Sequence, residues 1–230
     1  MNEWPEICMC LWKRIKPFPK IIRALENQTH KHFTLNVWCN TNLEEKKKIK
    51  ELLQKSTLKY KLYGDGENHG SKARFWIAPM VKRNPIIFLD DDQIPRIDFV
   101  EYMLKMYIKN PNSVQGWWCR TFSQDKYWGS LVKNNLETLP VDYIGTGGMI
   151  LDKKIVLDDR LQNIPDVCAK IEDLYLCYIA RKFYNCRLLK ISKKIKVIDD
   201  KHNQSKKLKK EKEDCFKFIR ENGYLLLNEL

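Results

Sequence analysis

The fold class is decided by the stretch Pro85-Ile86-Ile87-Phe88-Leu89-Asp90-Asp91-Asp92. Four consecutive apolar residues, bounded by a proline and three carboxylates, are typical of a strand that is buried on both faces. Strands of this kind occur mainly in parallel sheets that helices cover on both sides. The stretch therefore predicts a central parallel strand that places a carboxylate cluster at one edge of the sheet.

The residues before this strand repeat a strand–helix pattern. Each predicted strand is a continuous or alternating apolar run, and a segment with helically spaced apolar residues follows it. Three such units followed by a fourth strand predict an α/β fold, a mostly parallel sheet with helices on both faces. The predicted strands span 7–12, 33–39 and 58–62, and the predicted helices span 21–25, 43–55 and 71–81.

Polar residues stand where these predicted strands end. In open α/β sheets, ligands bind beyond the carboxyl ends of the strands, so the side chains there should converge on one cleft. Further on, we expect a helix over 97–108, strands over 114–120 and 187–191, and a helix from 171. The strand-end residues are Trp12, Lys13, Arg14, Asn40, Asp65 and the triplet Asp90, Asp91 and Asp92.

Composition limits the class of protein. The 230 residues carry 42 Lys and Arg against 29 Asp and Glu, a net charge of +13, which favours polyanionic partners such as nucleic acid, anionic membrane or phosphorylated molecules. A hydrophobic content of 43% excludes global disorder. No apolar run is long enough for a membrane-spanning helix, and residues 7–12 are too short for a signal peptide, so we expect a cytoplasmic protein.

Eight cysteines without a CxxC pair predict reduced thiols in the core and no structural zinc site.

The aspartate triplet predicts a metal site. Adjacent carboxylates repel one another, and a divalent cation relieves that repulsion. Oxygen ligands suit Mn²⁺ or Mg²⁺, which in turn bind phosphate oxygens. In extended backbone Asp90 and Asp92 point to one side and Asp91 to the other. The alternative is an acidic turn after a strand. His202 is a candidate late ligand, with a solvated loop histidine as the commoner outcome.

Two glycine-containing segments are candidate binding loops. Lys72 and Arg74 follow Gly70 at a predicted helix start, where cations and backbone amides suit a diphosphate, although basic residues are often only surface. Gly147 and Gly148 offer backbone that a ligand can approach, or simply a tight turn. Their segment, 145–148, lacks the spacings of dinucleotide and P-loop motifs.

Two further pairs of residues are candidates for chemistry. Glu172 and Asp173 open a predicted helix and could act in acid–base catalysis or be solvated carboxylates. Tyr127 and Trp128 lie in an aromatic segment without periodicity, where they could stack on sugar rings or pack in the core.

Together these motifs resemble those of the GT-A-fold nucleotide-sugar glycosyltransferases. The strand ending in Asp90–Asp92 is similar to the DXD strand of that family, residues 143–149 to its acceptor-side glycine segment, and Glu172-Asp173-Leu174 to its xED motif. The order and spacing also match, over roughly residues 5–200. Within the family, small glycosyltransferases encoded by large DNA viruses of algae and protists are the most similar, with a comparable Lys/Asn/Ile-rich composition.

The resemblance implies a fold and domain organisation. It implies a Rossmann-like, three-layer α/β/α sandwich with a mixed, mostly parallel sheet. We expect one domain over residues 1–230, with a nucleotide-binding half at about 1–95, an acceptor-binding half at about 96–200 and a basic segment at 201–230.

The resemblance also implies roles for the candidate residues. Asp90 would contact the donor ribose and Asp92 would bind the metal, with Asp91 assisting either of them. Asp90 and His202 would help to hold the metal. Asp173 would be the general base, with Glu172 beside it. The donor-binding set would be Trp12, Lys13, Arg14, Asn40, Asp65, Lys72 and Arg74, and the acceptor-binding set Tyr127, Trp128, Gly147 and Gly148.

The predicted function is a metal-dependent hexosyl- or deoxyhexosyltransferase. It would use Mn²⁺ or Mg²⁺ and move a sugar from a UDP-linked donor to a glycan or glycoprotein hydroxyl with inversion. The alternatives are a retaining glycosyltransferase, a metal-dependent nucleotidyltransferase and a basic nucleic-acid-binding module. No nucleic-acid motif is present, so we expect no nucleic-acid partner, and the Lys206–Lys212 run is either a solvated face or a contact with anionic membrane. If the protein is viral, its compartment would be the host cytoplasm.

Overall fold

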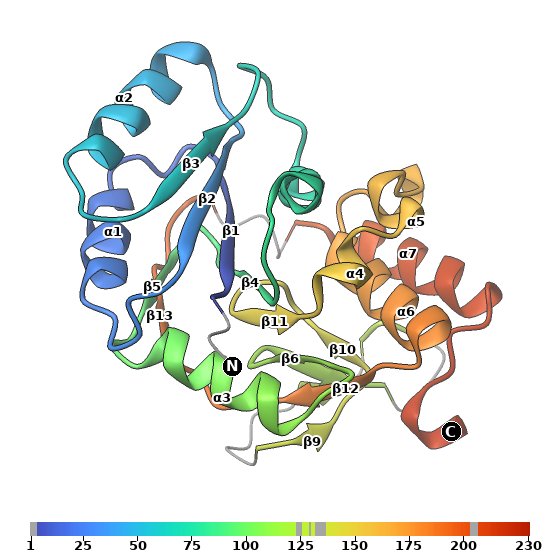
Figure 1. Ribbon diagram of the computed structural model, residues 1–230. Coiled ribbons are helices and arrows are strands. Elements are labelled where there is room, and N and C mark those ends of the chain that lie inside the picture. The colour runs from blue at the N-terminus through green and yellow to red at the C-terminus, as the bar shows by residue number, and fades with distance from the viewer. Residues whose placement is uncertain (1–3, 123–125, 129, 132–136, 203–206) are drawn as a thin grey trace.

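The computed structural model describes residues 4–122, 126–128, 130–131, 137–202 and 207–230 (Figure 1). Its centre is an eight-stranded mixed sheet in the order β3-β2-β1-β4-β11-β6-β12-β9. The strands are β1 (Glu6–Leu11), β2 (Thr34–Cys39), β3 (Tyr60–Tyr63), β4 (Ile86–Phe88), β6 (Ser113–Gly116), β9 (Leu139–Pro140), β11 (Met149–Leu151) and β12 (Arg187–Lys190).

Helices cover both faces of this sheet, so the predicted three-layer fold is confirmed. The sheet has an apolar core on each face, because alternate side chains of β1 point to opposite faces. Ile7, Met9 and Leu11 enter one core, and Cys8 enters the other. The first core is closed by α1 (Phe18–Glu26), α2 (Leu43–Gln54) and α3 (Phe99–Lys109). The second is closed by η1 (Ser71–Met80), α4 (Lys153–Val156), α5 (Asp159–Gln162), η2 (Asp166–Cys168), α6 (Glu172–Tyr184) and α7 (Lys209–Glu221).

The register of β4 places the aspartate triplet. β4 runs parallel to β1, with Glu6 opposite Ile86, and antiparallel to β11, with Met149 opposite Phe88. The Gly148 N–H also donates to the Phe88 carbonyl at 2.9 Å. The glycine segment before β11 is therefore fixed directly beside the end of β4.

Two small sheets complete the site side of the molecule. β5 (Gln93–Pro95) pairs with β13 (Ile195–Val197), and the Ile198 N–H donates to the Asp92 carbonyl at 2.7 Å. This pairing brings residues 198–202 to the triplet. The other sheet consists of β10 (Tyr143–Ile144), β7 (Cys119–Thr121) and β8 (Ser130–Leu131).

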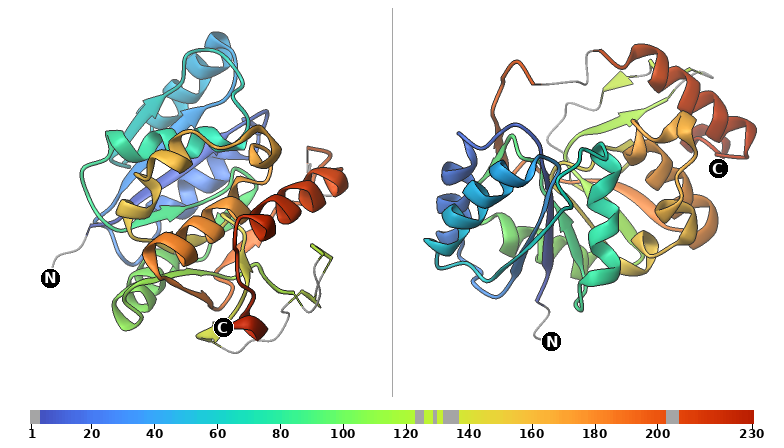
Figure 2. Two further views of the ribbon diagram at one scale, coloured as in Figure 1. Left: turned by 90° about the vertical axis from the view of Figure 1, so that its right-hand side faces the viewer. Right: turned by 90° about the horizontal axis from the view of Figure 1, so that it is seen from above.

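Several predicted elements differ in detail. The helix expected over 71–81 is 3₁₀ rather than α, with Pro79, which has no N–H to donate, near its end. The strand expected over 114–120 is divided between β6 and β7, because Trp117 and Trp118 interrupt it. The Lys-rich 193–213 stretch contains β13 and the start of α7, which packs beside α6 (Figure 2). A short 3₁₀ turn, η3 (Leu227–Glu229), follows α7.

None of the described helices is both long enough and apolar enough to cross a membrane.

Candidate functional site

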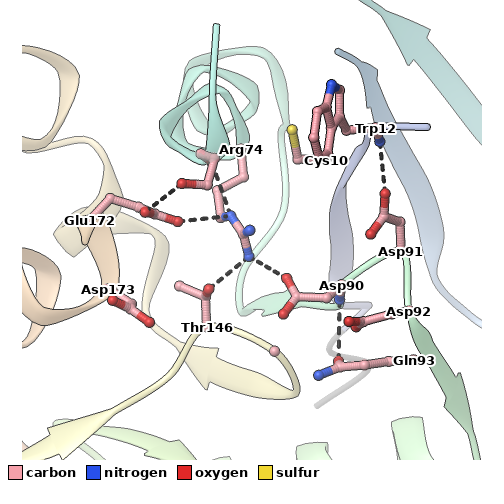
Figure 3. Close-up of polar contacts among 12 residues, drawn as sticks. Cys10, Trp12, Arg74, Asp90, Asp91, Asp92, Gln93, Thr146, Glu172 and Asp173 are labelled. Carbon is pink, nitrogen blue, oxygen red and sulfur yellow. Dashed lines mark hydrogen bonds and ion pairs between the residues drawn. The ribbon is translucent and has the colours of Figure 1, made fainter. Parts of the chain in front are cut away.

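The three aspartates lie between β4 and β5 and have different surroundings (Figure 3). Asp91 points inward, where it accepts hydrogen bonds from the Trp12 N–H at 2.7 Å and from Arg14 Nη1 at 2.6 Å. Asp90 accepts one from Arg74 Nη1 at 2.6 Å. Asp92 lies 3.6 Å from Arg14 Nη2. Asp91 therefore anchors the loop to the end of β1. The triplet itself is a turn rather than extended strand, since β4 ends at Phe88 and the Gln93 N–H donates to the Asp90 carbonyl at 3.1 Å.

The negative charge of Asp92 is only weakly balanced by nearby cations, since Arg14 lies 3.6 Å away. Burial, together with the charge of Asp90, raises its pKa to about 7, although Arg14 opposes the shift. A buried carboxylate beside other carboxylates is a position where a cation binds favourably. In the described part of the chain, no three His, Cys, Asp or Glu side chains are already arranged as a metal-ligand set. The donor set still fits Mn²⁺ or Mg²⁺, because these ions commonly take one or two carboxylates and complete their shell with substrate phosphate and water.

His202 lies near the triplet but contacts other groups. Its backbone N–H donates to Asp200 Oδ1 at 2.8 Å, and its ring centroid is 6.2 Å from that of Trp12 in an edge-on arrangement. Asp200 in turn accepts a 2.8 Å hydrogen bond from Arg14 Nε. The structure thus brings residues 198–202 to the end of β1. A ligand role for His202 stays a prediction.

Arg74 links four parts of the site. It donates to Asp90 at 2.6 Å, to Thr146 Oγ1 at 2.7 Å and to the Ser71 carbonyl at 3.1 Å, and its Nε lies 3.5 Å from Glu172 Oε1 (Figure 3). Ser71 Oγ also donates to Glu172 Oε2 at 2.6 Å. One guanidinium therefore holds the DXD loop, the glycine segment, η1 and the start of α6 together.

Gly147 has no room for a side chain. A Cβ atom there would lie 2.0 Å from Gln93 Nε2 and 2.4 Å from Asp90 Oδ2. Its carbonyl accepts a 2.8 Å hydrogen bond from Trp117 Nε1. Gly148 has φ +74°, a conformation that favours glycine. The backbone of this segment therefore lies directly against the carboxylate cluster. A simple tight turn would not need this contact.

Glu172 and Asp173 open α6 on the side of the glycine segment. Asp173 Oδ2 accepts a 2.5 Å hydrogen bond from the Tyr143 hydroxyl, and its Oδ1 accepts one from the Leu174 N–H at 2.9 Å. Burial raises the pKa of Asp173 above its ordinary value and raises that of Glu172 to about 7. Only Asp173 is partly exposed, since Glu172 is committed to Ser71 and Arg74. Asp173 is therefore the acid that a substrate can reach.

The remaining donor-side candidates have mixed positions. Asn40 is buried, donates to the Gly70 carbonyl at 2.8 Å and accepts from the His69 N–H at 2.7 Å, so it shapes the turn before η1. Asp65 is exposed and pairs with His69 at 2.8 Å, which lowers the pKa of Asp65. Lys13 is exposed, with its Nζ 4.6 Å from the Trp12 ring, and Lys72 is half-buried in η1. Their contacts with a donor stay predictions.

On the acceptor side, the two aromatic candidates separate. Tyr127 is 2% exposed and packs against Phe122 and Tyr143, so its ring is a core residue rather than a stacking surface. Trp128 is 47% exposed. Trp118 is 40% exposed and lies 3.0 Å from the Cβ position of Gly145, close to Asp173.

Several site residues escaped the sequence reasoning. No role was assigned from the sequence to Ser71, Gln93, Trp118, Tyr143, Thr146 or Asp200. For Thr146 and Tyr143 a signal existed, because both lie within residues 143–149, the segment that resembles the acceptor-side glycine segment of the family. For Asp200 none did, since its partner Arg14 is 186 residues away.

The fold is similar to that of TarS from S. aureus. Residues 1–349 of TarS in complex with UDP-GlcNAc superpose with a TM-score of 0.64 and 14% identity, covering 87% of this chain and 60% of that chain. The same fragment with UDP gives a TM-score of 0.61 and 15% identity, covering 83% and 58%. This chain therefore spans about 60% of the length of that TarS fragment. At these identities the likeness concerns the fold.

Comparisons of sequence give one further result. No curated protein sequence matches the chain significantly. The profile of the glycosyl transferase family 64 domain, however, matches residues 6–217, which include the aspartate triplet, the glycine segment and the Glu172–Asp173 pair. The chain therefore belongs to glycosyl transferase family 64.

Proposed function

We propose that the chain transfers a sugar from a UDP-linked donor to a hydroxyl of a glycan or glycoprotein. The observation that carries the proposal is that the glycine segment lies between two carboxylates at the carboxyl edge of the sheet. A Cβ atom at Gly147 would lie 2.4 Å from Asp90 Oδ2, and one at Gly145 would lie 3.7 Å from Asp173 Oδ2. Family membership supports a glycosyltransferase. The structural likeness to TarS bound to UDP-GlcNAc and to UDP supports a UDP-sugar.

The donor diphosphate would lie beside the triplet. Asp92 and Asp90 would hold Mn²⁺ or Mg²⁺, and the ion would offset the charge of the departing diphosphate. Arg74 donates a hydrogen bond to the Asp90 carboxylate, and Arg14 donates one to Asp91. The two arginines therefore hold the loop in place before the donor binds. A preorganised site of this kind loses little conformational freedom on binding.

Asp173 is the group that we propose as general base. It would take the proton of the acceptor hydroxyl while that oxygen bonds to the anomeric carbon and the bond from that carbon to the diphosphate oxygen breaks. A raised pKa makes its carboxylate a stronger base, and the Tyr143 hydroxyl fixes its orientation. A single displacement of this kind inverts the anomeric configuration.

A retaining transferase is the second candidate, and one contact favours it. Both oxygens of Asp173 already accept hydrogen bonds, from Tyr143 at 2.5 Å and from Leu174 at 2.9 Å, which reduces the capacity of the carboxylate to accept a proton. A retaining route uses the same donor site without a base at Asp173. The anomeric configuration of the product, read by NMR, distinguishes the two.

The test measures nucleotide release from a panel of UDP-sugars, with water or a glycan as acceptor. We expect UDP rather than pyrophosphate as product, which excludes a nucleotidyltransferase. Asp173→Asn should retain UDP binding and lose about 100-fold or more in turnover. Asp166→Asn, which changes an exposed carboxylate on η2 outside the cleft, should leave turnover unchanged. Full turnover by Asp173→Asn would contradict the base assignment.

A further inference from the structure

All eight cysteines are buried free thiols, but two of them meet. Cys215 Sγ of α7 lies 2.7 Å from Cys168 Sγ of η2, although the two residues are 47 positions apart. A disulfide joins its sulfurs at about 2.05 Å, so little movement separates this contact from a bond. We propose that Cys168 and Cys215 form a reversible disulfide that fastens α7 to the segment leading into α6.

The bond would connect two walls of the proposed active site. Cys168 lies just before α6, whose first residues are Glu172 and Asp173. Cys215 lies on the helix that holds the acceptor-side aromatic segment, because Glu213 Oε2 accepts a 3.2 Å hydrogen bond from the Tyr127 N–H. Oxidation would therefore fix this segment relative to α6, whereas in the reduced protein α7 is held only by non-covalent contacts, which can open locally.

Oxidised glutathione is an oxidant that balances the reaction. The thiolate of one cysteine attacks glutathione disulfide and releases one reduced glutathione, and the other thiolate then displaces the second. The S–H bonds of both cysteines and the S–S bond of glutathione disulfide break. One S–S bond forms within the protein, and the two protons go to the two molecules of reduced glutathione that leave. Both sulfurs are buried, and the contact with Cys168 together with burial raises the pKa of Cys215, so the reaction has to await local opening of α7.

The first experiment is mass spectrometry of the folded chain after incubation with oxidised glutathione. We expect a loss of about 2 Da, restored by dithiothreitol, with a cross-linked peptide containing both cysteines. Cys215→Ala and Cys168→Ala should each abolish the cross-link. Cys119→Ala, which removes another buried thiol, should still form it. If no 168–215 cross-link forms, even in sub-denaturing urea that promotes opening, or if other cysteines pair instead, the proposal is wrong.

The second experiment tests whether the bond holds α7 in place. The cross-linked protein should melt about 5–10 °C higher than the reduced protein, since a bond closing a loop of this length stabilises a chain of this size by that order. An unchanged or lower Tm would refute it. Oxidation should also change the KM for the acceptor without changing the affinity for UDP, an expectation that rests on the proposed function. The mass and the melting temperature do not depend on that function, so the disulfide and the proposed function can fail separately.

Discussion

Replacement of Arg74 by methionine should destabilise the fold and the candidate site together. The substitution keeps most of the side-chain volume and removes a charge that faces both Asp90, at 2.6 Å, and Glu172, at 3.5 Å. Removing one partner of a buried ion pair costs about 3–5 kcal/mol. Asp90 is 31% exposed and Glu172 keeps its hydrogen bond from Ser71, so we expect the lower end, about 3 kcal/mol.

Thermal unfolding measures this cost. For a chain of this size, about 3 kcal/mol corresponds to a fall in Tm of about 6–12 °C. The matched control is Arg160→Met, because Arg160 makes an equally short 2.6 Å pair with Asp158 but is 43% exposed. Asp158 is only 6% exposed, but it keeps hydrogen bonds from the Arg160 N–H and the Tyr184 hydroxyl when the guanidinium is removed. The control should therefore cost about 1 kcal/mol and lose no more than about 4 °C.

The cost of Arg74→Met should also depend on pH. Burial raises the folded pKa of Glu172 to about 7, above its unfolded value, and loss of the guanidinium raises it further. A carboxyl group with a raised folded pKa destabilises the fold at high pH and ceases to do so as it is protonated. The Tm difference between wild type and variant should therefore narrow between about pH 8 and pH 5.5. A Tm difference that is independent of pH, or no larger than that of Arg160→Met, would show that Arg74 does not stabilise the Glu172 carboxylate.

Three further predictions concern single residues. Gly147→Ala should weaken UDP binding about tenfold or more by calorimetry, because the new Cβ would lie 2.4 Å from Asp90 Oδ2; unchanged affinity would show that the Asp90 position is not needed. Because burial raises the pKa of Asp173 and a base acts only when deprotonated, kcat should rise with pH through that raised pKa, and a profile identical in Asp173→Asn would exclude the base role. Asp142→Ala removes a fully buried partner of Arg181 at 3.1 Å and should cost about 3–5 kcal/mol in urea unfolding; a loss below about 1 kcal/mol would contradict this.

The parts of the site that the sequence could predict are those encoded locally. An apolar strand that runs directly into Asp90–Asp92 predicts both its burial and the edge at which the carboxylates emerge, and both agree with the structure. The position of Glu172 and Asp173 at the first turn of a helix was equally local. These features depend on periodicity and on strand polarity, which a short window of sequence contains.

The parts that the sequence could not predict depend on long-range pairing. The antiparallel insertion of β11 between β4 and β6 sets the Gly147 contact, and no local pattern specifies it. The same holds for Arg14 and Asp200, which lie at opposite ends of the chain. Tyr127 illustrates a different difficulty. An aromatic residue in an aperiodic segment can stack on a sugar ring or pack in the core, and only the structure shows that the Tyr127 ring is buried against Phe122.

The proposed donor site is tested most directly by calorimetric titration of UDP and GDP, with and without Mn²⁺, into the wild type, Asp92→Asn and the control Asp166→Asn. We expect UDP to bind preferentially and its binding to weaken about tenfold or more without Mn²⁺. Asp92→Asn should remove this dependence on Mn²⁺, and Asp166→Asn should keep it. UDP binding that needs neither Mn²⁺ nor Asp92, or no nucleotide binding under any condition, would contradict the proposed donor site.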